Sequence, residues 1–222
     1  MKKMTEKKKI ETFFENKTTP EIAQNLLGMY LEHVTPMGKL AGYIVDAEAY
    51  LGPEDRAAHS YGMRDTPRVR AMYQKAGTIY LYTMHTNRIL NIITQPEGIP
   101  QGVMIRAVQP AAMIEQMSQN RGGKEGPDIS NGPGKLVKAL AIGPELYGQS
   151  IMDSESTLRL NFEKRKEPKQ IIALPRIGIP NKGEWTDMPL RYIVSGNPYI
   201  SLQKKSLIDQ NDWGWRNEDE KK

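Results

Sequence analysis

The sequence contains no cysteine in its 222 residues. Without cysteine a protein has no disulfide, no thiolate zinc site and no cysteine-held iron–sulfur cluster. Zinc-dependent base deaminases are excluded as well, because their Pro-Cys-x-x-Cys ligands are missing. Histidine is also scarce, and His33, His59 and His85 are not spaced as metal ligands. We therefore expect neither a metal nor another cofactor, and we assign a structural role to His33, at the end of an expected helix.

Long hydrophobic runs are missing too. No apolar stretch approaches the roughly 20 residues that a membrane-spanning helix needs. The chain begins with several lysines, but Glu6 interrupts them and no apolar core follows, so the segment does not resemble a secretory signal. We expect a cytoplasmic protein that does not bind membranes. The formal net charge of +5 permits contact with a polyanion but does not demand it.

The sequence shows no internal repeat and no clear linker, and 222 residues can bury the core of one large domain. We expect that domain to span residues 17–209, between a charged mobile tail at residues 1–16 and a polar tail at residues 210–222. Short strands and helices follow one another without the rhythm of repeated βαβ units. The expected fold class is therefore α+β, a single domain with a mixed or antiparallel curved sheet flanked by helices.

Local patterns predict the order of the elements. A helix starts at about Pro20, with Thr19 as its N-cap. A second helix spans residues 66–77 and leads into a strand that has Tyr80, an expected core aromatic, and Tyr82 on one face. The remaining expected elements are a strand at residues 103–107, helices near residues 110–119 and 134–141, a solvated charged loop at residues 163–169, and short strands in the last third.

Polar and apolar residues alternate along residues 45–50. On a strand, this pattern puts Asp46, Glu48 and Tyr50 on one face and small apolar residues on the other. A Gly-Pro turn then ends the strand, and His59 follows it. Such alternation occurs on solvated faces as well as in pockets, so the spacing alone leaves both interpretations open.

This segment is the first of several ordered motifs. They are residues 46–55 (DAEAYLGPED), 57–60 (AAHS), 66–68 (TPR), 77–82 (GTIYLY), 105–107 (IRA), 132–136 (GPGKL), 183–185 (GEW) and 189–191 (PLR). In this order, over roughly residues 40–201, they resemble the alkyladenine (3-methyladenine) DNA glycosylases. Several ordered motifs over that length are a specific signal, whereas a single tetrapeptide would be a weak one.

The resemblance implies an α+β enzyme that flips a damaged purine out of DNA and hydrolyses its N-glycosidic bond. It gives the catalytic role to Glu48, which would take a proton from the attacking water and stabilise positive charge on the sugar. Asp46 lies on the same strand face and competes for that role on spacing alone. No lysine accompanies Glu48 in the strand motif, so we expect water as the nucleophile and a monofunctional glycosylase.

The resemblance also implies the residues that bind the flipped base. Family residues that match Tyr50, His59 and Tyr82 enclose the base. Asn91 matches an asparagine that disfavours the 2-amino group of guanine, a role that suits its donor and acceptor atoms. Arg106 matches an arginine near the pocket, and a buried ion pair is an equal alternative for it.

Contacts to the DNA backbone are expected outside the base site. The residues with this expected role are Arg64, Thr66, Arg68, His85, Lys135 and Gly196. The first three stand around an expected helix start, where N–H groups and arginine forks suit phosphate, although arginines also form surface salt bridges. Lys135 matches the lysine of a Gly-Pro-Ser-Lys run, with Gly134 in place of the serine, and both a phosphate contact and a structural role are open to it.

The segment before Asn91 departs from the family. Vertebrate members carry a tyrosine wedge that enters the minor groove and fills the space of the flipped nucleotide. Here the segment between Tyr82 and Asn91 is one residue shorter and contains His85. His85 or a neighbour would have to fill that space, and the grip on duplex DNA could be weaker.

We therefore expect a DNA glycosylase that removes 3-methyladenine, 7-methylguanine, hypoxanthine and ethenoadenine from duplex DNA and leaves an abasic site. Its partner would be double-stranded DNA with damaged purines, bound by a monomer associated with the nucleoid. Two alternatives stay open. One is a protein that flips and holds damaged bases but turns over poorly, and the other is an RNA-directed hydrolase of the same fold.

Overall fold

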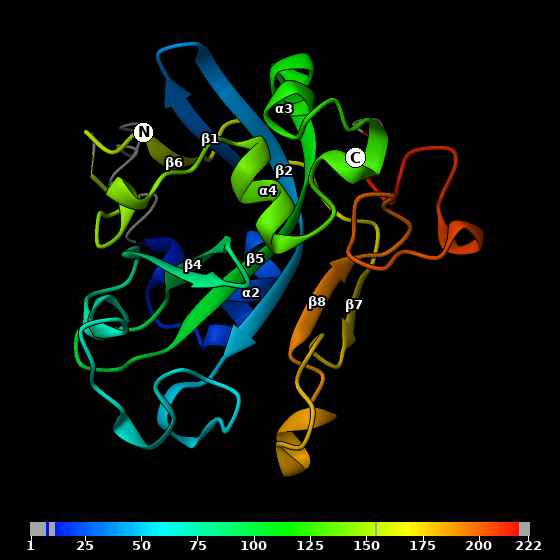
Figure 1. Ribbon diagram of the computed structural model, residues 1–222. Helices are drawn as coiled ribbons and strands as arrows, with labels where there is room; N and C mark the ends of the chain where they lie inside the picture. Colours follow the sequence, from blue (N-terminus) through cyan, green and yellow to red (C-terminus); the bar gives the residue numbers. More distant parts are fainter. Residues whose placement is uncertain (1–7, 9–11, 154, 218–222) are drawn as a thin grey trace, which may run out of the picture.

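The longest strand, β2 (Gly38–Tyr50), organises the fold (Figure 1). The computed structural model describes residues 8, 12–153 and 155–217. Along one edge β2 pairs with β5 (Gly102–Ala112), and along the other it pairs first with β1 (Tyr30–Thr35) and then with β8 (Arg191–Val194). Its register with β5 shifts between Ile44 and Ala47, and such bulges bend a strand. The sheet therefore bends near the point where β2 changes partners.

The remaining strands extend this sheet. They are β3 (Ile79–Met84), β4 (Asn87–Ile93), β6 (Leu158–Asn161) and β7 (Ile171–Leu174). The main path runs β3-β4-β5-β2-β1-β6, while β8 joins β2 and β7 joins β8. All of these strand pairs, within the residues that the structure describes, are antiparallel. The expected α+β class with a curved sheet is confirmed.

Short helices cover the sheet. The α-helices whose full extent is described are α2 (Thr19–Leu26), α3 (Ile114–Asn120) and α4 (Pro133–Ala139). The 3₁₀ helices are η1 (Gly52–Glu54), η2 (Tyr61–Met63), η3 (Arg70–Tyr73), η4 (Gly126–Ile129), η5 (Pro144–Leu146), η6 (Gly183–Thr186) and η7 (Lys205–Leu207). α2 packs against β2 and β5, and α4 packs against β4 and β5. The two helices thus cover neighbouring parts of the central strands.

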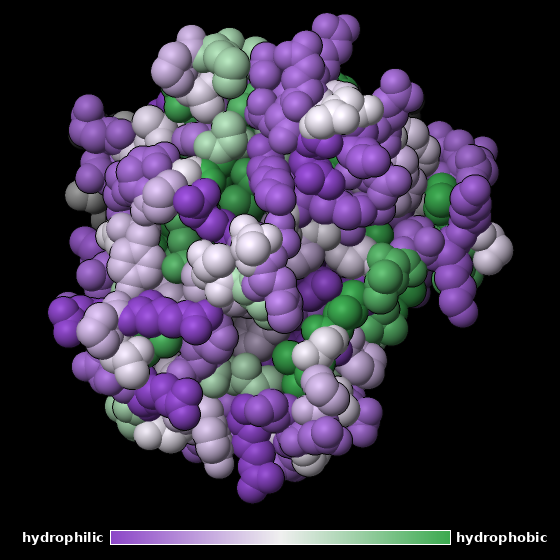
Figure 2. Space-filling view, in the orientation of Figure 1, coloured by the Kyte–Doolittle hydropathy of each residue, from purple (hydrophilic) through white to green (hydrophobic). Residues whose placement is uncertain are grey.

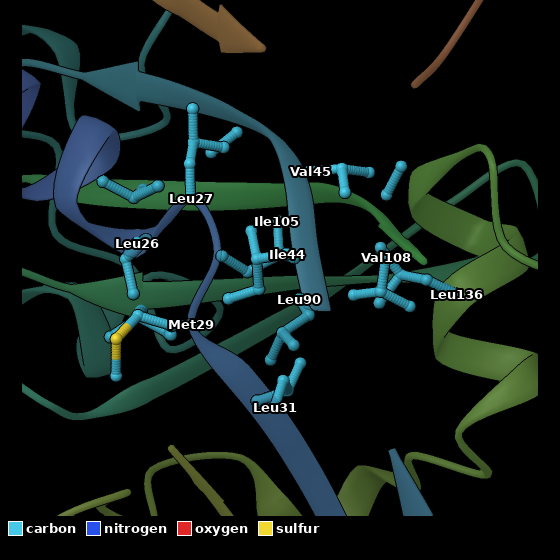
Figure 3. Close-up of a cluster of buried hydrophobic side chains, with 14 of the residues drawn as sticks. Leu26, Leu27, Met29, Leu31, Ile44, Val45, Leu90, Ile105, Val108 and Leu136 are labelled. Atoms are coloured by element: carbon cyan, nitrogen blue, oxygen red, sulfur yellow. The ribbon is translucent and has the colours of Figure 1, made fainter. Parts of the chain in front are cut away.

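The hydrophobic core lies between these helices and the sheet (Figure 3). Leu26 at the end of α2 and Leu136 of α4 reach into it. The strands contribute Ile44, Leu90 and Ile105, each with no exposed surface. On the outside, β7 is an edge strand, and hydrophobic side chains gather over β7 and β8 on an otherwise largely hydrophilic face (Figure 2). The buried core fixes the central strands that carry the site described below.

The helix expected at about Pro20, which is α2, starts one residue earlier than the sequence predicted. Its N-cap is Thr18, not Thr19, because Glu21 forms a capping box with it. The Thr18 Oγ1 atom accepts from the Glu21 N–H, and the Glu21 carboxylate accepts from the Thr18 N–H. Thr19 is instead buried and bonds to the side chains of Thr94 and Gln101.

The expected helix at residues 66–77 does not form. The segment consists of a turn and η3, held by i to i+3 bonds such as Val69 N–H to Thr66 O. Two tyrosine side chains bond to the main chain of this region. The Tyr147 hydroxyl accepts from the Ala71 N–H, and the Tyr73 hydroxyl donates to the Arg64 carbonyl oxygen. These tertiary contacts override the local signal of a helix start.

The start of α3 and the element that contains His33 also differ from what the sequence predicted. Residues 110–112 still belong to β5, so the helix expected near residues 110–119 begins only at Ile114. His33 lies within β1, not at a helix end. Its ring Nδ1 is 2.7 Å from the Leu140 carbonyl oxygen in a buried setting, which agrees with a structural role.

The expected domain limits at residues 16/17 and 209/210 stay predictions, because residues 1–7, 9–11 and 218–222 lie outside the described residues. Close to those limits, Phe13, Phe14 and Trp215 are buried in the core. In the loop at residues 163–169, Lys166 lies over the rings of Tyr43 and Trp215. None of the helices in the described part of the chain is long and apolar enough to span a membrane.

Candidate active site

A cavity of about 280 Å³ opens where β2 ends. Its walls come from the end of β2, the loop after it, β3, β4, β5 and the loop after β7. The lining includes Tyr50, His59, Tyr82, Asn91 and Arg106, all expected from the sequence to bind a base. The structure therefore brings together five residues that are as far as 56 positions apart in the chain.

A larger and more open cavity of about 970 Å³ lies beside the start of α2. Lys17, Thr94 and Trp185 are among its lining residues. None of the site residues expected from the sequence, all of which the structure describes, lines it. We place the candidate site in the smaller cavity, because the expected titratable and aromatic groups converge there.

Glu48 is fully buried next to this cavity, and its carboxylate has three partners. The Tyr50 hydroxyl donates to Oε2 at 2.9 Å, and the Ile177 N–H donates to Oε1 at 2.8 Å. Arg106 Nη1 lies 3.0 Å from Oε1. The alternation of the strand places Glu48 and Tyr50 on one face, as the sequence predicted, and all three partners line the cavity.

The pKa of Glu48 is raised above the ordinary value for a glutamate, first because burial disfavours the charged form. The Arg106 guanidinium and the Ile177 N–H act in the opposite direction, since each stabilises the carboxylate. A carboxylate balanced in this way can accept a proton more readily than a solvated one. The geometry and the shifted pKa together suit a general base.

Asp46 shares the strand face with Glu48, but it forms its own buried ion pair. Arg191 binds it in a bidentate manner, with Nε 2.9 Å from Oδ1 and Nη2 2.7 Å from Oδ2. The Ser201 N–H donates to the same carboxylate at 2.9 Å. The partners of Glu48 line the cavity, whereas Arg191 and Ser201 do not, so the geometry favours Glu48 over Asp46 for the catalytic role.

Aromatic side chains form much of the cavity wall. The centroid of the His59 ring is 4.5 Å from that of Tyr82, and His59 Nδ1 is 2.9 Å from the Tyr80 hydroxyl. Tyr80 is 2% exposed, yet it lines the cavity as well as the core, so its description as an ordinary core aromatic was incomplete. Burial raises the pKa of Tyr50 well above the usual value and that of Tyr82 to about 12, so both hydroxyls stay protonated near neutral pH.

The surroundings of His59 favour the neutral form of its imidazole. Burial lowers its pKa, and the positive charges of Arg68 and Arg64 lower it further. A neutral imidazole presents one donor and one acceptor nitrogen, whereas a protonated ring presents two donors. The part of the wall that His59 and Tyr82 form is therefore aromatic, and the Arg106 guanidinium lies elsewhere in the lining.

Asn91 and Arg106 complete the wall. Asn91 Nδ2 donates to the carbonyl oxygen atoms of Tyr80 at 3.1 Å and Ile89 at 3.4 Å, which anchors the side chain. Arg106 lines the cavity and also forms a buried ion pair with Glu48, so its position agrees with both interpretations considered from the sequence.

The residues expected to contact DNA lie in different places. Arg68 donates to the Thr83 carbonyl oxygen at 3.3 Å, and its guanidinium is 5.7 Å from the centre of the Tyr82 ring, so it lies close to the cavity. Arg64 and Thr66 are exposed in the neighbouring loop. Arg191, the first residue of β8, pairs with Glu48, whereas Gly196 lies beyond the opposite end of this strand. Gly196 is not among the residues that line the cavity.

His85 stands in the turn of the β3–β4 hairpin. This turn has two residues, His85 with φ 46° and Thr86 with φ 67°, as in a type I′ turn. Met84, just before the turn, is 48% exposed and lines the cavity. The shorter segment noted in the sequence is thus a tight hairpin at the cavity.

Lys135 lies in the first turn of α4. Its Nζ is 2.9 Å from Asp128 Oδ1 and 2.7 Å from Asn131 Oδ1, so it is paired within the chain. Gly134 beside it packs against the hairpin, because a Cβ atom there would lie 2.7 Å from the Cβ of Asn87. The missing serine of the family motif therefore has a packing reason.

No pattern in the sequence indicated a role at the site for Arg176, Asp55 or the main chain of Ile177. Asp55 lies inside the first motif, but nothing in its spacing indicated a partner. Arg176 follows Pro175 without a recognisable pattern. The ion pair between Arg176 and Asp55 joins residues 121 positions apart, and only the folded structure reveals it.

Residues 12–198 match the sequence model of the methylpurine-DNA glycosylases (MPG). The chain belongs to this family. Proteins named "Putative 3-methyladenine DNA glycosylase" are similar to it over most of their length. That of Enterococcus faecalis is 63% identical over 217 residues, which cover 98% of this chain and 94% of that protein.

Other bacterial relatives carry the same name. The protein of Listeria monocytogenes is 50% identical over 202 residues, 90% of this chain and 96% of that protein. The protein of Staphylococcus carnosus is 48% identical over 202 residues, 90% of this chain and 97% of that protein. The methylpurine-DNA glycosylase match includes every expected site residue, from Glu48 to Gly196. Family and relatives agree that the chain is a DNA glycosylase.

Proposed function

We propose that this chain excises damaged purines from duplex DNA and leaves an abasic site. Its substrates are 3-methyladenine, 7-methylguanine, hypoxanthine and ethenoadenine. The observation that carries the proposal is the buried carboxylate of Glu48, held by Tyr50, Arg106 and the Ile177 N–H beside an aromatic cavity. Family membership supports the reaction class, and the geometry supports the residue roles.

The cavity binds a base that has rotated out of the duplex. Extrusion costs about a few kcal/mol for unstacking and unpairing. Stacking on an aromatic side chain contributes roughly 1–3 kcal/mol per base, and the cavity offers Tyr50, His59 and Tyr82. Because a damaged base pairs less well, its extrusion costs less, and the aromatic wall offsets much of that cost.

Glu48 activates the water. Its carboxylate takes a proton from the water as the oxygen bonds to C1′ of the sugar, and the bond between C1′ and the purine nitrogen breaks. The electron pair of that bond leaves with the base. The negative carboxylate also stabilises the oxocarbenium-like charge that develops on the sugar. An alkylated or deaminated purine is electron-poor and leaves more readily than a normal one.

Water rather than an amine is the nucleophile. A Schiff base with the sugar would need a lysine close to C1′. Among the residues that the structure describes, no lysine lines the cavity. The enzyme is therefore monofunctional and does not cleave the DNA strand.

Asn91 contributes to the selection against normal guanine. Its side chain is anchored to the main chain of β3 and β4 and forms part of the cavity wall. A purine with a 2-amino group directed at this anchored side chain meets steric resistance. Adenine derivatives and hypoxanthine have no such group, whereas 7-methylguanine keeps it and is excised because its electron-poor ring leaves more readily than normal guanine.

The test is base release from a duplex that carries one hypoxanthine, followed by alkali to cut the abasic site. Glu48→Gln keeps the size of the side chain but cannot accept the proton. We expect it to lower the rate of release by about 10²–10⁴-fold while lesion binding is retained. Unchanged release by Glu48→Gln would remove Glu48 from the mechanism. Duplexes with ethenoadenine and 3-methyladenine test the breadth of the substrate range.

The tight β3–β4 turn favours one second candidate, a protein that holds a flipped base but releases it slowly. The two-residue turn at His85 and Thr86 contains no tyrosine that could fill the space of the flipped nucleotide. In that case wild type would bind the hypoxanthine duplex specifically without cleavage, and ethenoadenine and 3-methyladenine would give the same result.

A further inference from the structure

Arg176 forms a fully buried ion pair beside the candidate site. It follows β7 in the chain, and its side chain and that of Asp55 have no exposed surface. Arg176 Nη1 is 2.5 Å from Asp55 Oδ2, and Nη2 is 2.9 Å from Oδ1. This bidentate geometry fixes the plane of the guanidinium.

The same guanidinium holds the end of β2. Its central carbon lies 4.6 Å from the centre of the Tyr50 ring, and Nη1 also donates to the Ala49 carbonyl oxygen at 3.0 Å. Nη2 donates to the Trp185 carbonyl oxygen at 3.3 Å, which ties η6 to the same point. The ring of Tyr50 therefore has Arg176 against one face while its hydroxyl donates to Glu48.

Asp55 fixes the loop that follows β2. Its Oδ2 accepts from the Leu51 N–H at 3.0 Å, and its Oδ1 accepts from the Ala57 N–H at 2.9 Å. Ala57 and His59, which come next in this loop, line the cavity. The carboxylate thus holds a second wall of the cavity in place.

The residue after Arg176 provides a partner of Glu48. The Ile177 N–H donates to Glu48 Oε1, and residues 177–179 line the cavity. Two of the three groups that contact the carboxylate, the Tyr50 hydroxyl and the Ile177 N–H, are therefore positioned by one buried arginine.

We infer that Arg176, paired with Asp55, is a positioning residue for the glycosylase reaction, because it holds the Tyr50 hydroxyl and the Ile177 N–H on the Glu48 carboxylate. The inference deepens the proposed function and rests on it. Arg176 does not line the cavity, and it acts through Tyr50 and Ile177. The comparable pair of Asp46 and Arg191 contacts neither of these groups.

The decisive variant is the double substitution Arg176→Met with Asp55→Asn. Removing both charges avoids an unpaired buried charge, which would destabilise the fold strongly. Methionine retains a long flexible stem, and asparagine retains one acceptor for the loop. Arg176→Lys is the second variant, because a lysine keeps the charge but cannot form the bidentate pair.

The measurement is the single-turnover rate of hypoxanthine release between about pH 5 and 9. We expect the rate constant of the double variant to fall about 10- to 100-fold, since small misplacements of catalytic groups have effects of this size. The acid limb of the profile moves to higher pH, because Glu48 loses an N–H donor that stabilises its charged form. Affinity for the lesion changes less than the rate constant.

The control is Glu32→Gln with Arg159→Met. This removes a partly buried ion pair between β1 and β6, whose groups do not contact Glu48. We expect the rate and the acid limb to stay at wild-type values, although the thermal midpoint falls. A double variant of Arg176 and Asp55 that folds and keeps the wild-type rate and pH profile would overturn the inference. An equal loss of rate in both double variants, with no movement of the acid limb, would also overturn it.

Hydrogen exchange separates this inference from the proposed function. We expect the peptide that contains Ile177 to exchange faster in the Arg176 variants than in wild type, and unchanged protection would contradict the positioning role. If wild type releases none of the damaged bases, the proposed function fails, and the exchange result still shows whether Arg176 holds the Ile177 amide.

Discussion

At the scale of single residues, Glu48 is subject to opposed influences. Burial raises its pKa, while Arg106, the Ile177 N–H and the Tyr50 hydroxyl lower it. The net shift is upward, so the carboxylate is protonated at a higher pH than a solvated glutamate. Activity that needs the charged form is therefore lost as the pH falls through this raised pKa.

Arg106→Met tests this balance. Without the guanidinium, the pKa of Glu48 rises further, because the largest stabilising influence on its charged form is gone. We expect the acid limb of the single-turnover pH profile to move to higher pH, with a lower rate at pH 6 than in wild type. Arg121→Met is the control, since its Nε bonds to the Ile129 carbonyl oxygen, away from Glu48. An acid limb that stays in place or moves to lower pH would contradict the role of Arg106.

The sequence could predict Glu48 and Tyr50 on one face, because strand alternation is a local property. The roles of the cavity residues came from resemblance to a family, and the structure then placed them around one cavity. Arg176 could not be found in this way. Its partners are Asp55, 121 positions away, and the ring of Tyr50, and no local pattern encodes such a contact.

At the scale of elements, the β3–β4 hairpin and α4 fit closely together. The hairpin turn is short, and Asn87 at its end approaches Gly134 in the first turn of α4. Local signals predicted β3 and α4, but they indicated neither β4 nor the hairpin turn, and the fit between the hairpin and α4 depends on tertiary packing. Local signals failed at residues 66–77, where side chains of Tyr73 and Tyr147 bond to the main chain and only η3 forms.

Gly134→Ser tests the fit between the two elements. The new Cβ would lie 2.7 Å from the Asn87 Cβ, so one element has to move. We expect destabilisation of about 1–3 kcal/mol, as for other overpacked sites, measured by thermal or denaturant unfolding. Asn87→Gly in the same chain should restore most of that loss.

Gly132→Ser is the matched control for this substitution. Gly132 is the N-cap of α4 with φ −173°, and the nearest atom to a new Cβ is in the flexible Lys135 side chain at 3.6 Å. Serine is favoured at an N-cap, so stability should stay the same or rise slightly. If Gly134→Ser is as harmless as Gly132→Ser, the hairpin and α4 are less tightly packed than described.

At the scale of the whole molecule, positive charge near the cavity matters more than the total of +5. Arg68 lies over Tyr82 and bonds to β3, and Arg64 is exposed in the same loop. Lys135 is paired with Asp128 and Asn131, which favours a structural role for it. We therefore expect Arg68 to be a stronger phosphate contact than Lys135.

Arg68→Gln should reduce the dependence of DNA binding on salt. Each phosphate contact contributes about −0.9 to the slope of log affinity against log salt concentration on duplex DNA. We expect the slope to become less negative by roughly this amount, measured by titration at several salt concentrations. Lys39→Gln, an exposed lysine near the β1–β2 turn, should leave the slope unchanged. Equal slopes for wild type and Arg68→Gln would place Arg68 outside the DNA contact.

The late position of Ile177 in the chain also affects when the enzyme becomes competent during synthesis. Glu48 is translated 129 residues before Ile177, whose N–H bonds to its carboxylate. At translation speeds of about 5–20 residues per second, that interval lasts roughly 6 to 26 s. Until residues 177–179 are made, a nascent chain lacks one wall of the cavity, so we expect a product that ends before them to release no base from DNA.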